Sequence, residues 1–125
     1  MLKIVNTLLL ALLLLGCSGK PSDSEVFEQI TASITTPNVY KVVDIERLNG
    51  WMEDQQYVVE VNYTIMFTND IENAAKHMAK QSGFLGGLGA MALKMQFGDF
   101  KKGDTRSITH AFHFRQTENG WRLND

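Results

Sequence analysis

The chain has 125 residues, with 12 basic and 14 acidic side chains, a formal net charge of −2 and a single cysteine, Cys17. Its longest basic run is Lys101-Lys102, so it lacks the basic patch that is typical of nucleic-acid-binding proteins. One cysteine excludes an internal disulfide, so the packed core has to stabilise the folded domain.

The N-terminal segment has the three parts of a secretory signal. Lys3 supplies a positive charge, residues 4–15 form an apolar run, and Gly16 is the small residue before a cleavage site. The apolar run is shorter than the roughly 20 residues that a membrane-spanning helix needs. We therefore expect a cleaved signal rather than a transmembrane anchor. An ordinary signal peptide beside an unrelated cysteine is the alternative.

The sequence Leu14-Leu15-Gly16-Cys17 resembles the lipobox of bacterial lipoproteins. The resemblance implies cleavage between Gly16 and Cys17, and acylation of Cys17 on its thiol and its new amino group. In that family the next residue influences sorting. Ser18, in place of an aspartate, implies the outer membrane, facing the periplasm, in a bacterium with two membranes. The expected parts are a signal peptide (1–16), a lipidated tether (17–22) and a single domain (23–125).

The mature domain is predicted to begin with an amphipathic helix. Ser22 and Glu25 have the spacing of a capping box. Pro37 ends the helical pattern, because the residue before a proline is disfavoured in the helical conformation. Apolar side chains recur at helical spacing between these limits. The predicted buried stripe is Val26, Phe27, Ile30 and Ile34.

Two strands follow, over residues 39–52 and 57–68, with a turn at residues 53–56. The second strand alternates apolar and polar side chains, which is typical of an antiparallel strand buried on one face. Its predicted inner face is Tyr57, Val59, Val61, Tyr63, Ile65 and Phe67. Asn49-Gly50 indicates a bulge or bend in the first strand.

A second helix is predicted after Asn69 or Asp70, with Ile71, Ala74, Ala75, Met78 and Ala79 on its buried face. The next segment, residues 83–93, has no charge and four glycines. Helical spacing resumes in Phe84, Leu88, Met91 and Met95. Three interpretations of this segment stay open: a close-packed helix junction, an exposed contact with a membrane or protein partner, or a mobile lid over a pocket. If the segment is a contact, it is predicted to extend over residues 83–97, with Phe84, Leu85 and Leu88 as contact residues.

The C-terminal part is predicted to be a polar loop (98–104), a strand (105–116), a tight turn at Asn119-Gly120 and a short strand (121–123). The inner side chains of the longer strand are predicted to be Ile108, His110, Phe112 and Phe114. The order α-β-β-α-β-β predicts an α+β fold in which a curved antiparallel sheet packs on helices.

In this arrangement the chain resembles small bacterial lipoproteins with cystatin-like or NTF2-like folds. The resemblance rests on the paired-strand block of residues 44–51 and 57–63 and on the closing residues 117–123. It implies a single domain of that kind over most of the mature chain.

The sequence predicts no catalytic residue, metal site or cofactor. His110 and His113 fall on opposite faces of a strand, and Asp44 and Glu46 lie on a solvated one. We therefore expect a non-enzymatic, lipid-anchored protein that binds or helps to assemble another envelope component, with an envelope protein as partner and no nucleic acid. The alternative is a carrier of a small apolar ligand between sheet and helix. Its predicted pocket wall is Trp51, Tyr63, Phe97, His110 and Trp121.

Overall fold

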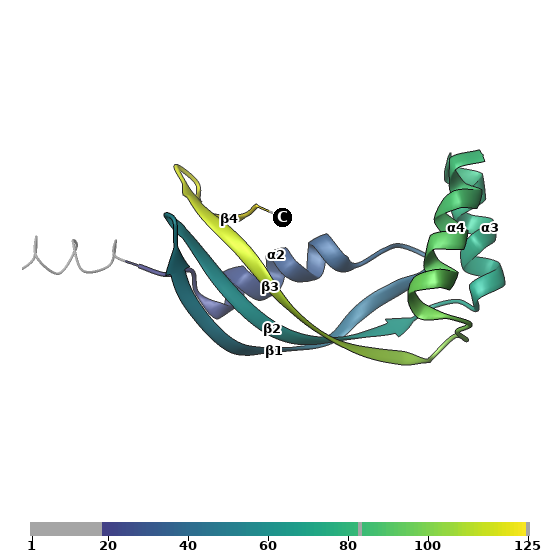
Figure 1. Ribbon diagram of the computed structural model, residues 1–125, viewed down its shortest axis with the longest axis horizontal. Coiled ribbons are helices and arrows are strands. Elements are labelled where there is room, and N and C mark those ends of the chain that lie inside the picture. Colours follow the sequence, from purple (N-terminus) through teal and green to yellow (C-terminus); the bar gives the residue numbers. More distant parts are fainter. Residues whose placement is uncertain (1–18, 83, 125) are drawn as a thin grey trace, which may run out of the picture.

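The computed structural model describes residues 19–82 and 84–124 (Figure 1). The predicted signal peptide, the cleavage site at Gly16 and the lipidation site Cys17 lie outside the described residues. The elements of the described part are, in order, α2 (Asp23–Ile34), β1 (Tyr40–Glu53), β2 (Gln56–Phe67), α3 (Ile71–Ser82), α4 (Phe84–Phe97), β3 (Thr105–Thr117) and β4 (Gly120–Leu123).

The strands form one antiparallel sheet in the order β1-β2-β3-β4. The α+β class with an antiparallel sheet is thereby confirmed. The predicted order α-β-β-α-β-β is wrong in one element, because residues 84–97 form a helix of their own and the order becomes α-β-β-α-α-β-β. Glycines weaken helix propensity, so the sequence pattern did not separate this helix from a junction or a loop.

Helix α2 begins as its capping box predicts. The Glu25 backbone N–H donates to Ser22 Oγ at 3.2 Å, and the Ser22 backbone N–H donates to the Glu25 carboxylate at 3.1 Å. Val26 and Ile30 are buried, and Phe27 and Ile34 pack against the core. The predicted stripe is therefore confirmed.

Removal of this cap gives a first testable prediction. Ser22→Ala is expected to lower the free energy of unfolding by about 1 kcal/mol, because it leaves an N–H of the first turn without its acceptor. Ser24→Ala, at an exposed serine within the same turn, is the control and is expected to change it by less than about 0.5 kcal/mol. Urea unfolding followed by circular dichroism measures both; equal losses would contradict the capping role.

Strand β1 is irregular at two points. Its register with β2 shifts between Val42 and Asp44 and again between Arg47 and Asn49. The irregularity predicted at Asn49-Gly50 is thus present one residue earlier, at Leu48. The bulge at Val43 was not predicted. Both shifts increase the local bend of an edge strand.

The core lies between the helices and one face of the sheet. The six predicted inner residues of β2 are all buried. Gln29 joins α2 to β4, since its side chain donates to Trp121 O at 2.7 Å and accepts from the Leu123 N–H at 2.8 Å. Phe100, within the loop predicted to be polar, is only 2% exposed and stacks on Phe67 with 3.8 Å between ring centroids. This loop therefore contributes to the core.

Helix α3 starts where the sequence predicts, and Asp70 is its cap residue, since the Ala74 N–H donates to Asp70 O at 2.9 Å. The helix begins at Ile71, directly after the predicted caps. The Asp70 carboxylate, however, accepts the Lys102 backbone N–H at 2.8 Å, and the Asn69 amide donates to Asn38 O at 2.8 Å. Both side chains fasten the helix start to neighbouring loops. Ala79, predicted to be buried, is exposed.

Candidate functional site

Helices α3 and α4 form a hairpin (residues 71–97) at one end of the long axis of the molecule (Figure 1). The two helices contact each other more extensively than they contact the sheet. Gly89 allows a close approach, because a Cβ added there would lie 2.6 Å from the terminal methyl group of Met78. The hairpin is therefore a projecting unit with a limited base on the core.

The outer side of α4 carries exposed apolar side chains. Leu88 is 52%, Met91 63% and Met95 86% exposed. Their spacing of three and four residues places them in one row along the helix, which we call the apolar stripe. Leu93 and Phe97, on the same helix, pack against the core. A helix that is apolar on all sides is normally buried, so the stripe is a surface that lacks a covering element in the described chain.

The stripe overlaps the predicted contact only in part. Leu88 was predicted and is exposed, whereas the side chains of Phe84 and Leu85 lie outside the described part of the chain. Met91 and Met95 lie within the predicted contact segment 83–97, although they were not among its named contact residues. Their spacing was the available signal, although periodicity alone does not say whether an apolar row faces the core or the solvent.

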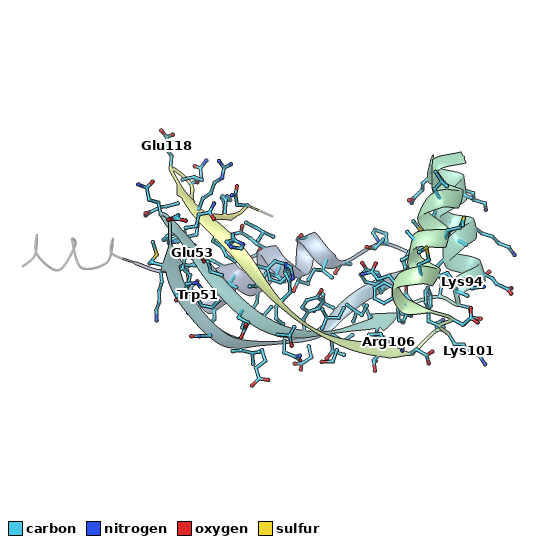
Figure 2. All side chains as sticks on the ribbon, viewed as in Figure 1. Trp51, Glu53, Lys94, Lys101, Arg106 and Glu118 are labelled. Atoms are coloured by element: carbon cyan, nitrogen blue, oxygen red, sulfur yellow. The ribbon has the colours of Figure 1, made fainter. Side chains whose placement is uncertain are left out.

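The hairpin carries a positive charge. Residues 71–97 contain Lys76, Lys80 and Lys94 against the single acid Glu72, a net charge of +2 in a chain whose total is −2. All three lysines are exposed; Figure 2 labels Lys94 near the base of the hairpin. Lys94 Nζ lies 3.9 Å from the exposed Asp99 carboxylate, and an exposed pair at this separation contributes little. The apolar stripe is thus accompanied by available positive charge.

The five residues predicted to line a ligand pocket are not brought together. Tyr63 and Trp121 are buried in the core, and Phe97 packs edge-on against Tyr40 and Phe67. Trp51 stands opposite Val58, on the other face of the sheet, and its indole N–H donates to Glu53 at 3.2 Å (Figure 2). These positions do not form one wall.

His110 corrects a further expectation. It pairs with Val61 and so takes the inner register that was predicted. It is nevertheless exposed, with its ring edge-on to Phe112 at 4.6 Å between centroids. Among the described helices, α2 contacts β1 and β4, and the hairpin stands beyond the end of the sheet. Neither therefore buries this part of β3.

Two open cavities lie at the base of the hairpin. One, of about 280 Å³, is lined by Ile71, Glu72, Ala75, Met91, Lys94 and Asp99. The other, of about 400 Å³, is lined by Asp70, Ile71, Glu72, Asp99, Phe100, Lys101 and Asp104. Both have charged rims and neither contains a predicted wall residue, so neither supports the apolar-carrier alternative.

Within residues 19–82 and 84–124, the structure places no group of three or more His, Cys, Asp or Glu side chains that could hold a metal ion. No helix in this part of the chain is long and apolar enough to cross a membrane. Comparison of the chain with models of protein families, with curated proteins and with solved structures gave no match.

The buried Tyr63 gives a prediction on pH. Burial, with a smaller contribution from Tyr40, raises the pKa of the Tyr63 hydroxyl above its usual value. A raised pKa in the folded state means that the contribution to stability is complete below about pH 10, the value for an unfolded tyrosine, and is lost as the pH rises further. Above that pH, the free energy of unfolding should fall less steeply for Tyr63→Phe than for the unsubstituted protein. Urea unfolding at several alkaline pH values tests this; identical slopes for both proteins would contradict it.

Proposed function

We propose that the chain is a lipid-anchored protein of the bacterial cell envelope that acts by binding and not by catalysis. Its contact for another envelope component is the α3–α4 hairpin. The observation that carries the proposal is the apolar stripe of Leu88, Met91 and Met95, which is exposed on a helix with little polar surface. A row of this kind marks an interaction site more often than an isolated exposed side chain does.

The position of the hairpin supports this role. The described chain starts at Gly19, two residues after Cys17, at the opposite end of the long axis from the hairpin (Figure 1). Asp23, at the start of α2, bonds Arg47 at 2.8 Å, and Arg47 also donates to Tyr57. From Tyr57, β2 continues for ten residues, about 33 Å of strand, to Phe67, which contacts Phe97 of the hairpin. Acyl chains on Cys17 would therefore leave the hairpin unobstructed.

The proposal includes the domain type. A sheet that meanders from β1 to β4 across α2 supports a cystatin-like or NTF2-like domain, with the hairpin as an insertion between β2 and β3. The long sheet then places the contact surface and the anchor at opposite ends of the domain.

Substitution of Leu88 tests the function. Leu88→Asp is expected to reduce capture of the bound component tenfold or more, because a carboxylate in an apolar contact must be desolvated. The free energy of unfolding should change by less than about 0.5 kcal/mol, since the site is exposed. Chemical crosslinking in intact cells followed by mass spectrometry measures capture. If Leu88→Asp unfolds the protein, the residue is core and the proposed contact is wrong.

Leu48 provides a matched control. It is 48% exposed on the first strand, a fraction close to that of Leu88. Leu48→Asp introduces the same charge far from the hairpin and is expected to leave capture unchanged. Equal losses from both substitutions would point to a general effect of negative charge and would contradict a contact that is specific to the hairpin.

A further inference from the structure

The hairpin combines an apolar row with a positive charge, and this combination identifies a class of surface. Leu88, Met91 and Met95 supply side chains that can enter an acyl layer, and the three lysines of the hairpin can extend their charged ends to lipid headgroups. Anionic headgroups attract basic residues that lie near a membrane surface. We propose, resting on the lipid-anchored function above, that the component bound by the hairpin is an anionic lipid surface.

The distribution of charge over the fold favours the same orientation. The outer face of β1 and β2, which points away from the helices, carries the acids Asp44, Glu46, Glu53 and Glu60 against one base, Lys41, while the same face of β3 and β4 carries Arg115 and Arg122. An anionic surface attracts the hairpin and repels the acidic outer face of β1 and β2. A domain held by the hairpin therefore presents its acidic strands to water.

The anchor and the hairpin can reach a single flat membrane. Val26 of α2 and Ala74 of α3 belong to one core cluster, and both helices lie on the same side of the sheet (Figure 1). The described chain starts at the other end of the long axis from the hairpin, just before α2. With its long axis along the membrane, the domain would be attached at both ends.

The length of α4 determines how it contacts the membrane. The 14 residues of α4 span about 21 Å, less than the roughly 30 Å of a bilayer core, so the helix lies in the membrane interface and does not cross the bilayer. Acyl chains on Cys17 would keep the hairpin close to its membrane, and a tethered second contact needs only modest affinity of its own.

A single-cysteine label tests the inference in the complete lipidated protein. Acylation of Cys17 consumes its thiol, so Met95→Cys introduces one reactive thiol at the most exposed position of the stripe. The protein is labelled with an environment-sensitive fluorophore and reconstituted in phosphatidylglycerol–phosphatidylethanolamine vesicles that contain brominated acyl chains. Val43→Cys, at a site 47% exposed on β1, is the matched control.

The expected result is several-fold stronger quenching at position 95 than at position 43. This difference should shrink in phosphatidylcholine vesicles and with Lys76→Glu plus Lys80→Glu. Equal, weak quenching at both positions in anionic vesicles would overturn the inference. If Leu88→Asp still abolishes crosslinks to a protein in cells, the proposed function stands with a protein partner. If mass spectrometry finds Cys17 unmodified, the lipid-anchored function itself fails.

Discussion

Replacement of Phe67 by alanine is expected to lower the free energy of unfolding by about 3–5 kcal/mol. Phe67 is fully buried at the end of β2, stacked on Phe100 at 3.8 Å and edge-on to Phe97 at 5.4 Å and Tyr40 at 6.0 Å between centroids. These partners belong to the hairpin, its following loop and β1. The substitution therefore removes the side chain at which β1, β2, the hairpin and its following loop meet. Urea unfolding followed by circular dichroism measures the loss of stability.

The same substitution should loosen the hairpin selectively. The junction depends on Phe67 and its neighbours, because the Phe67 N–H donates to Asp104 O at 2.8 Å, and the Ile71 N–H donates to Phe100 O at 3.1 Å. Amide hydrogen exchange in residues 71–97 is expected to accelerate more than exchange in α2.

Phe114→Ala is the control for this effect. Phe114 is also fully buried, but it pairs with Tyr57 and Leu123 at the opposite end of the sheet. A comparable loss of stability without selective exchange in the hairpin is expected. If both variants accelerate exchange uniformly, Phe67 is an ordinary core residue and the hairpin has no separate hinge at its base.

Local patterns in the sequence predicted the regular parts of this fold. In β2, alternation alone assigned every second residue from Tyr57 to Phe67 to the inner face, because successive side chains of a strand point in opposite directions. The Ser22 and Glu25 spacing located the start of α2 for a similar reason, since a capping box is formed within one turn. Both features depend only on residues that are close together in the chain, so they can be predicted from the sequence.

The features that the sequence did not predict depend on distant contacts. Phe100 is buried because it meets Phe67, 33 positions earlier, and nothing within the polar loop indicates this. Alternation gave the register of His110 but not whether a helix covers it. The row containing Met91 and Met95 was visible as a period, yet its exposure follows from where the hairpin stands relative to the sheet.

The lipid anchor is a sequence prediction with a decisive test of its own. Cys17→Ser, made with an ordinary cleavable signal peptide in place of residues 1–16, is expected to move the protein from the membrane fraction to the soluble fraction of the periplasm, because serine offers no thiol for acylation. One acyl chain gives only marginal binding at about 0.8 kcal/mol per buried methylene, and several chains hold a protein firmly. Cell fractionation with immunoblotting measures the shift, and mass spectrometry reports the lost acyl mass.

Two controls separate the anchor from the hairpin. Ser18→Ala leaves Cys17 intact and should remain in the membrane fraction. Cys17→Ser protein should still bind anionic vesicles weakly and in a salt-sensitive manner, because salt screens the charges of the hairpin lysines. Adding Met95→Asp should abolish this remaining binding. Cys17→Ser protein that stays in washed membranes at high salt would contradict acylation as the anchor. Loss of all vesicle binding in Cys17→Ser would leave the acyl chains as the sole attachment and place the hairpin's partner away from the bilayer.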